Sequence, residues 1–191
     1  MPPPRDPRSR RANRVRIIGG TWRSRLIDFP DAEGLRPTPD RVRETLFNWL
    51  GQHLAGRRVL DLFAGSGVLG FEALSRGASA AVLVDRSREA VRLLQANAEK
   101  LRASGAELVQ SDALEFLARK GNVPFDVVFV DPPYASGLQE QVLERLAPHL
   151  APDAVVYVES AAPIAPDGWT VLKLGRAGAV SYQLLRRKGD D

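Results

Sequence analysis

The chain has 191 residues, a length that fits one domain or one domain with a short appendage. Hydrophobic residues form 44% of it, enough for a packed core, and no apolar run is long enough to span a membrane. It contains no cysteine and only two histidines, which excludes disulfides, thiolate metal sites and Cys nucleophiles, and we expect no metal. The first residues lack the apolar stretch of a secretory signal, so we expect a cytoplasmic protein.

The net charge of +4 is unevenly distributed along the chain. Residues 1–58 hold thirteen Arg and six acids, whereas residues 59–191 carry a small negative balance. This asymmetry predicts an N-terminal nucleic-acid contact attached to a more neutral catalytic body. Arg suits that role because its planar fork binds phosphate and stacks on bases. The alternative is a solvated Arg-rich face without a partner.

The first 57 residues read as a leader and an extension. Residues 1–13 are rich in Pro and Arg and are expected to be disordered. Residues 14–19 and 24–29 predict a β-hairpin around Gly20-Thr21-Trp22. Asp40 is expected to cap a helix that runs to Leu50, since apolar residues recur there at helical spacing. Residues 14–57 are therefore interpreted as an RNA-contacting extension, with contacts expected from Arg14, Arg16, Arg23, Arg25, Arg36, Arg41 and Arg43.

The arginines between residues 36 and 44 admit other roles. We consider three roles for this stretch: contact with RNA phosphate, closure over a cofactor, or ion pairs with Asp40 and Glu44 of the same stretch. The side chains concerned are those of Arg36, Arg41 and Arg43 and the hydroxyl of Thr38. We favour a mixed role beside the active site.

Residues 58–188 predict one α/β domain. Strands are expected at 59–63, 81–84, 107–110, 126–130 and 154–158, with helices at 67–76, 87–102, 113–119 and 138–150 between them. Residues 171–174 and 180–186 predict a terminal hairpin. Alternating strands and helices imply a parallel sheet covered on both faces, with the loops after the strands along one ligand-binding edge.

The first of these loops is glycine-rich. The segment Asp61-Leu62-Phe63-Ala64-Gly65-Ser66-Gly67-Val68-Leu69-Gly70 contains G-x-G-x-x-G, which dinucleotide folds also use. Asp61 would repel a pyrophosphate at this turn but would attract the ammonium of S-adenosylmethionine, a cofactor without phosphate. We therefore expect S-adenosylmethionine rather than a dinucleotide, bound by Asp61, Phe63, Ala64, Gly65, Ser66 and Gly67.

Acids also follow the next two strands. Asp85, with Arg86 beside it, is placed to meet ribose hydroxyls, and Asp112, with Ala113, is placed to meet the adenine amine. The alternative for each acid is a helix-terminal role, which is stronger for Asp112 because Ser111-Asp112 is also a good helix cap.

The fourth strand ends in Asp131-Pro132-Pro133-Tyr134, the predicted catalytic motif. An aromatic amine is a poor nucleophile because its lone pair is delocalised into the ring. The Asp131 carboxylate and the Pro132 carbonyl can hold its hydrogens so that the lone pair turns toward the methyl group. Pro132 and Pro133 stiffen the backbone, and Tyr134 can stack on an extruded base. The alternative is a Pro-rich strand exit with a core tyrosine.

The two motifs together resemble class I methyltransferases that act on amino groups. The segments 16–25 and 35–47, with the tail 175–178 and Tyr182, resemble the bacterial RsmD family of 16S rRNA (guanine(966)-N(2))-methyltransferases over about residues 14–187. The resemblance implies a Rossmann-like, seven-stranded, mostly parallel sheet with an antiparallel C-terminal hairpin and an N-terminal β-hairpin extension. It also implies a guanine substrate in the small ribosomal subunit or its assembly intermediate, and we expect a monomer.

Two other classes of function compete with this interpretation. DNA adenine-N6 and protein glutamine methyltransferases share the (Asn/Asp)-Pro-Pro-Tyr motif, but the Arg-rich front and the lack of a separate DNA-recognition domain argue against both. A non-catalytic RNA-binding assembly protein is a further alternative, against which the intact Asp61, Asp131 and Tyr134 argue.

Overall fold

A seven-stranded sheet organises the molecule. The computed structural model describes residues 13–31, 37–119, 121, 123–133 and 136–189. The strand order is β5-β4-β3-β6-β7-β9-β8, in which β3 to β7 are parallel and β9 runs antiparallel to both of its neighbours. The strands are β3 (Arg58–Asp61), β4 (Ala80–Asp85), β5 (Ala106–Gln110), β6 (Phe125–Val130), β7 (Leu150–Ser160), β8 (Trp169–Ala177) and β9 (Val180–Arg187). The predicted fold class, including the C-terminal hairpin, is confirmed.

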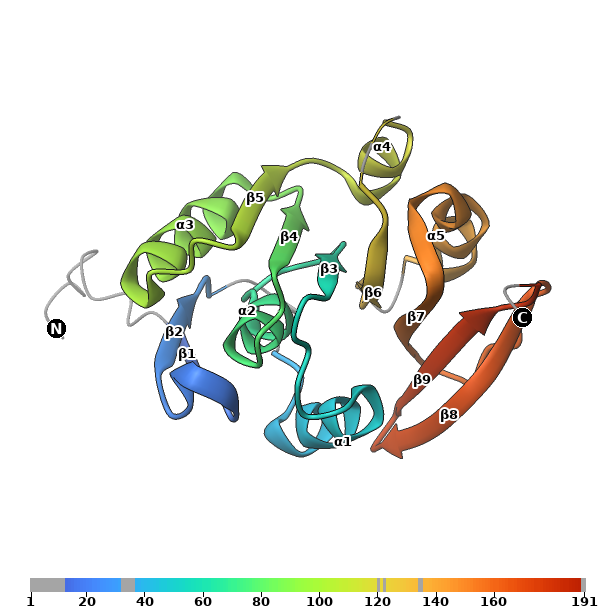
Figure 1. Ribbon diagram of the computed structural model, residues 1–191, viewed down its shortest axis with the longest axis horizontal. Helices are drawn as coiled ribbons and strands as arrows, with labels where there is room; N and C mark the ends of the chain where they lie inside the picture. Colours follow the sequence, from blue (N-terminus) through green and yellow to red (C-terminus); the bar gives the residue numbers. More distant parts are fainter. Residues whose placement is uncertain (1–12, 32–36, 120, 122, 134–135, 190–191) are drawn as a thin grey trace, which may run out of the picture.

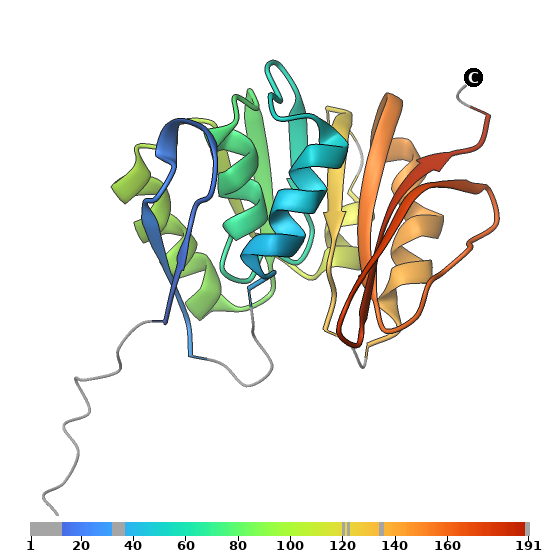
Figure 2. The ribbon, with the colours of Figure 1, turned by 90° about the horizontal axis from the view of Figure 1, so that it is seen from below.

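Helices cover both faces of this sheet, as Figures 1 and 2 show. The helices α1 (Asp40–Leu50), α2 (Val68–Ser75) and α3 (Arg88–Leu101) lie on one face, and α4 (Ala113–Leu117) and α5 (Leu138–Leu146) lie on the other. Alternate strand residues supply the two cores: Val59 and Phe129 face the first layer, and Leu60 and Val128 face the second. Burial on both faces explains why these strands are almost uniformly apolar. None of the described helices is both long and apolar enough to cross a membrane.

The N-terminal extension forms a hairpin that docks on α2 and α3. The strands β1 (Asn13–Arg16) and β2 (Leu26–Phe29) pair antiparallel, with a short 3₁₀ turn, η1 (Gly20–Trp22), between them. The Asn97 side chain of α3 bonds both the N–H and the C=O of Asp28. Gly20 has φ +72° and lies so close to α2 that a Cβ atom would stand 1.8 Å from the Ser75 carbonyl oxygen. Only glycine fits this contact.

Several expected boundaries were wrong, among them the start of α1, the end of α5 and the start of β7. Asp40 is the first residue of α1 rather than its cap, and Pro39 precedes the helix. As a first-turn acid Asp40 still complements the positive helix N-terminus, and it binds arginine side chains instead of backbone N–H groups. The helix expected at 138–150 ends at Leu146 in a 3₁₀ turn, η2 (Ala147–His149), because Pro148 has no N–H to continue it. The strand β7 consequently begins at Leu150, before the expected residue 154.

Candidate active site

A cavity of about 850 Å³ opens at the carboxyl ends of the parallel strands. It lies where β3 and β6 are neighbours although their connections leave in opposite directions, the position at which open α/β sheets bind ligands. Nearly all of the predicted cofactor residues line it, namely Asp61, Phe63, Ala64, Gly65, Ser66, Asp85, Arg86, Asp112 and Ala113. Residues 131–133 line it too, so the tertiary structure brings the two predicted motifs to one site.

Asp61 is a buried carboxyl at the centre of this cavity wall. It is 2% exposed and accepts a hydrogen bond of 3.3 Å from the Gly70 N–H. Burial, aided by the nearby charge of Asp85, raises the pKa of Asp61 to about 7, although backbone N–H donors act in the opposite direction. No described basic side chain forms an ion pair with it. The site is therefore suited to a ligand that brings a positive charge.

The glycine turn shapes the adjoining wall. Gly67 is the one predicted cofactor residue that does not line the cavity, and its role is conformational. Its φ of +78° starts α2, and a Cβ atom there would stand 2.4 Å from Leu94. Leu94 of α3 therefore packs against one side of the turn, and Gly65 and Ser66 on its other side line the cavity.

Asp85 and Asp112 both have structural roles that coexist with the predicted cofactor contacts. Asp85 accepts hydrogen bonds of 2.8 Å from the N–H groups of Gly65 and Ser87, which fixes the glycine turn to the end of β4. Asp112 caps α4 through Oδ1, which accepts from Leu114 and Glu115. Its Oδ2 receives no hydrogen bond from the described part of the chain and stays available at the cavity.

Asp131 follows β6 and lies opposite Asp61. Burial of its carboxyl, and then the charges of Glu159 and Asp61, hold the pKa of Asp131 well above its usual range. Pro132 is buried and Pro133 is exposed, and both line the cavity. Tyr134, the last residue of the predicted catalytic motif, lies outside the described residues.

A third carboxyl, Glu159, joins them from the end of β7. It is 4% exposed, lines the cavity, and accepts hydrogen bonds from the Tyr157 and Thr38 hydroxyls. Sequence reasoning missed Glu159 and Tyr157, although an acid after an apolar strand is the same signal that marked Asp61 and Asp131. Among the described residues, no group of three or more His, Cys, Asp or Glu side chains is arranged to hold a metal ion.

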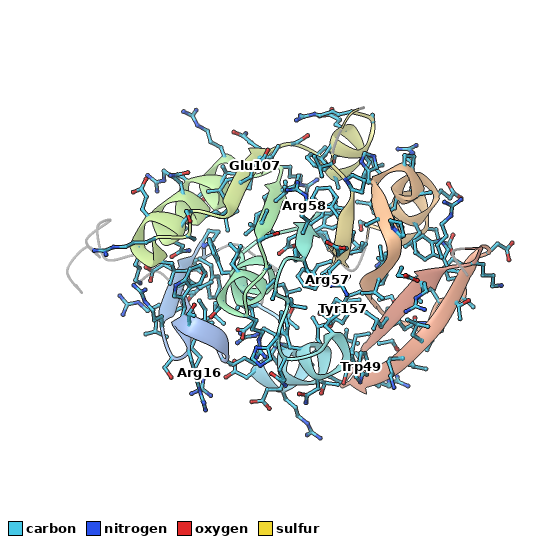
Figure 3. All side chains as sticks on the ribbon, viewed as in Figure 1. Arg16, Trp49, Arg57, Arg58, Glu107 and Tyr157 are labelled. Atoms are coloured by element: carbon cyan, nitrogen blue, oxygen red, sulfur yellow. The ribbon has the colours of Figure 1, made fainter. Side chains whose placement is uncertain are left out.

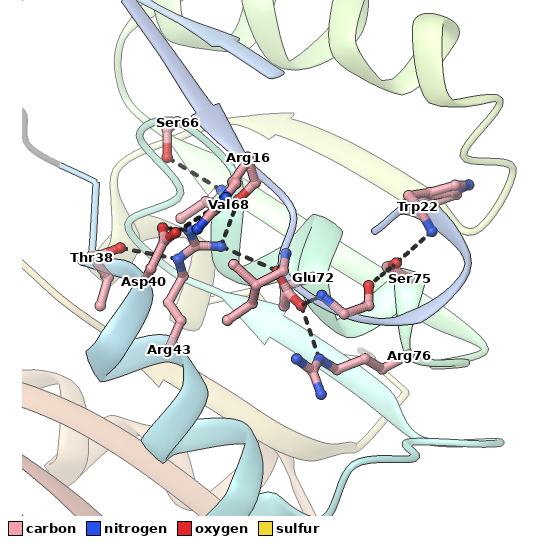
Figure 4. A network of polar contacts seen from close by, with 12 residues as sticks. Arg16, Trp22, Thr38, Asp40, Arg43, Ser66, Val68, Glu72, Ser75 and Arg76 are labelled. Carbon is pink, nitrogen blue, oxygen red and sulfur yellow. Dashed lines mark hydrogen bonds and ion pairs between the residues drawn. The ribbon is translucent and has the colours of Figure 1, made fainter. Parts of the chain in front are cut away.

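The RNA contact predicted for Arg43 is wrong. Its side chain is fully buried and donates to the Thr38 and Arg16 carbonyls, to Glu72 at 3.1 Å and to Asp40 (Figure 4). Burial lowers its pKa, and the charges of Glu72 and Asp40 oppose that shift. A side chain enclosed in this way cannot reach RNA. Of the three roles considered for the stretch, Arg43 has the internal one, with Asp40 but not with Glu44.

The other predicted RNA contacts lie on the surface of the extension. Arg14, Arg16, Arg23, Arg25 and Arg41 are exposed. Arg14 pairs with Asp28 and Arg16 pairs with Asp40 at the start of α1, while Arg25 donates to the Lys100 carbonyl. Arg36 lies outside the described residues. These positions leave an RNA role open to the exposed arginines.

Comparison with known proteins gives one consistent result. The family model described as "Conserved hypothetical protein 95" matches residues 15–186. "Ribosomal RNA small subunit methyltransferase D" of Escherichia coli strain K12 is 46% identical over 183 residues, covering 93% of this chain and 92% of that protein. The protein of the same name from Haemophilus influenzae is 45% identical, covering 90% and 93%. A solved structure described as "Putative methyltransferase yhhF from Escherichia coli" superposes with a TM-score of 0.83 over 92% of this chain and 98% of that one, at 46% identity.

These similarities extend over the hairpin extension and the sheet alike, and so over both motifs that form the cavity. The chain is accordingly a member of the RsmD family of methyltransferases.

Proposed function

We propose that this protein transfers the methyl group of S-adenosylmethionine to the exocyclic N2 of a guanine in 16S ribosomal RNA. One observation carries the proposal: Asp61, beside the glycine turn, and Asp131, in the Asp-Pro-Pro segment, open into the same cavity from neighbouring strands. The reaction requires one carboxyl that binds the positive charge of the cofactor and one that positions the target amine. The names of the relatives support ribosomal RNA as the substrate.

The cofactor half of the cavity fits the chemistry of S-adenosylmethionine, which carries an ammonium, a sulfonium and no phosphate. Asp61 is the proposed partner of the ammonium, Asp85 of the ribose hydroxyls, and the free Oδ2 of Asp112 of the adenine amine. The cavity volume lies within the range of small-molecule sites. When bound, the cofactor supplies an electrophilic methyl group to the other half of the cavity.

Asp131 and the Pro132 carbonyl are the proposed acceptors for the two hydrogens of the target amine. They orient the nitrogen lone pair out of the ring plane toward the methyl carbon, a contribution of position rather than of strong basicity. Bound S-adenosylmethionine would supply the methyl group to this nitrogen, and Asp131 would accept the proton that the amine loses. The base must leave its stack to enter the cavity, and Tyr134 is proposed to stack on its face.

The remaining assignments belong to the same proposal. We expect the protein to act as a cytoplasmic monomer, without a metal, on the small ribosomal subunit or its assembly intermediate. The exposed arginines of the extension are proposed to hold the RNA backbone.

The test is transfer of labelled methyl groups to small ribosomal subunits that lack the modification, in the presence of a chelator, followed by mapping of the modified base. The expected result is one methyl group per subunit, on guanine N2, and none on subunits that already carry it. Transfer to adenine, to DNA or to protein, or a need for a divalent ion, would contradict the proposal.

A further inference from the structure

Glu159 lines the cavity, and one of its carboxylate oxygens accepts no hydrogen bond from the described residues. Its Oε1 accepts hydrogen bonds of 2.8 Å from the Tyr157 hydroxyl and of 3.3 Å from the Thr38 hydroxyl. Its Oε2 receives no hydrogen bond from any described residue, and it is not one of the fully buried unpaired side-chain atoms, which are Arg58 Nε and Arg186 Nε. Since Glu159 lines the cavity, Oε2 is an acceptor that a ligand can reach.

The surroundings of Glu159 hold it in place. Gln139 of α5 donates to the Glu159 backbone carbonyl at 3.1 Å, and Arg43 fixes Thr38 by donating to its carbonyl oxygen at 3.0 Å. Tyr157 lies on the α1 side of the sheet (Figure 3). Its ring makes an edge contact with the ring of Phe129. The two hydroxyls hold the carboxylate and Gln139 holds the backbone that carries it. The carboxylate therefore has a defined direction, which recognition of a base edge requires.

The chemistry of the bases decides what two neighbouring acceptors can read. Guanine presents two donors side by side, the N1–H and the N2 amine. Adenine presents one donor, the N6 amine, beside the N1 acceptor. Val130 pairs with Val158, so Asp131 and Glu159 follow at the same level on neighbouring parallel strands, and both line the cavity. The charge of Glu159 helps to raise the pKa of Asp131.

We propose that Glu159 is a specificity-determining residue that accepts the N1–H of the target guanine while Asp131 accepts from its N2 amine, an inference that rests on the proposed function. Adenine would place its N1 lone pair against the Glu159 carboxylate, and two acceptors that face each other out of water are strongly unfavourable.

The protonation state of Glu159 decides which base this pair of carboxyls would select. A protonated Glu159 would donate and so suit adenine instead. Both hydroxyls donate to Oε1, which favours the ionised form and opposes the rise in the pKa of Glu159 that burial causes. The N1–H of guanine would then donate to the ionised Glu159 while the N2 amine donates to Asp131.

The experiment uses RNA that carries 2,6-diaminopurine at the target position. This base keeps the amine at C2 but has an acceptor at N1, so it separates amine positioning from N1–H recognition. Wild-type enzyme should prefer guanine by about a hundredfold in kcat/KM, the effect of leaving buried polar groups unpaired. Glu159→Gln offers an N–H donor, so guanine should lose activity, diaminopurine should gain it, and the preference should shrink at least about tenfold.

Controls separate this inference from the function on which it rests. Glu144→Gln, the same change on an exposed position of α5, should keep the wild-type ratio, and cofactor affinity should be unchanged in both variants. A wild-type enzyme that methylates both bases equally overturns the inference even if Glu159→Gln fails to fold, as does an equal loss on both bases in a folded variant. Failure of the proposed function looks different: wild-type enzyme would transfer no methyl group to guanine RNA.

Discussion

Asp61 links the cofactor site to the stability of the protein through one proton. Burial raises its pKa from 3.8 to about 7, so the folded protein binds this proton more tightly than the unfolded chain does. The stabilisation from this group is therefore complete at acid pH and is lost as the pH rises from about 4 to about 7. Above that range the unliganded protein holds an unpaired buried carboxylate, which a cationic cofactor would offset.

Asp61→Asn should reveal both consequences. Cofactor affinity at about pH 8 should fall roughly ten- to a hundredfold, because a charge-assisted bond to the ammonium is lost. The free energy of unfolding of the unliganded variant should exceed that of the wild type by a few kcal/mol at about pH 8, with the difference gone below about pH 4. Calorimetry and urea denaturation measure the two effects.

The matched control for Asp61→Asn is Asp167→Asn, an exposed carboxyl just before β8, a strand whose far end reaches the cavity. It should change neither quantity. Unaltered cofactor binding in Asp61→Asn would remove the ammonium assignment.

We expect Asp131 to affect the rate of methyl transfer and not the binding of the cofactor. Asp131→Ala should lower the single-turnover rate about a hundredfold, since a positioned acceptor contributes about 3 kcal/mol to the barrier, while cofactor affinity stays within about twofold. Single-turnover kinetics on subunits that lack the methyl group, with calorimetry alongside, measure both. A fully active variant would make the Asp-Pro-Pro segment structural and leave the reaction without its proposed acceptor.

At the scale of elements, Glu72 joins the N-terminal extension to the catalytic sheet. This fully buried side chain of α2 accepts from the Ile18 and Gly19 N–H groups, from Arg43 and from Arg76 (Figure 4). Through Arg43 the network also reaches Thr38, and so the wall of the cavity. The extension is thus joined to the wall of the cavity through buried polar contacts.

Glu72→Gln tests that network. It leaves the Arg43 and Arg76 charges buried without the carboxylate that both of them bind, so the free energy of unfolding should fall by about 3–5 kcal/mol. Asp28→Asn, which removes surface ion pairs to Arg14 and Lys100, should cost at most about 1 kcal/mol. Urea denaturation of both variants gives the comparison, and equal small losses would show that the network contributes no more than a surface pair.

At the scale of the whole molecule, charge is separated along the chain: residues 1–58 are basic and the rest is slightly acidic. Among the described residues of the basic part, Arg14, Arg16, Arg23 and Arg25 are exposed on the hairpin. The hairpin lies beside α2 and α3 (Figures 1 and 2). Arg16 pairs with Asp40 next to the Thr38 wall of the cavity, so RNA bound along the hairpin would lie near the site of methyl transfer.

Replacing Arg14, Arg16, Arg23 and Arg25 by Gln should weaken RNA binding. The slope of log affinity against log salt should become shallower by about 0.9 for each duplex phosphate that these side chains no longer neutralise. Cofactor affinity should not change, because none of the four lines the cavity. The measurement is the RNA affinity of wild type and variant at several salt concentrations. A slope equal to that of the wild type would mean that these arginines form only a solvated surface.

The sequence by itself determined the sheet, the order of its elements and the two motifs, because apolar periodicity and strand-end acids are local signals. Asp61, Asp85, Asp112 and Asp131 were found in this way, and all four line one cavity. Local signals also placed the hairpin and the helix after it, although they misjudged the start of that helix and the length of α5.

Only the tertiary structure decided which charged residues face inward. Helical spacing places Arg43 on the same face of α1 as Leu46 and Phe47 and places Arg41 on the polar face. Only the tertiary structure shows that Arg43 is enclosed with Glu72, from an element 29 residues away. Thr38 and Glu159, 121 residues apart, meet at the cavity because the extension packs over the sheet. A buried ion pair or a shared hydrogen bond depends on which distant side chain supplies the partner, and no periodicity within either segment records that choice.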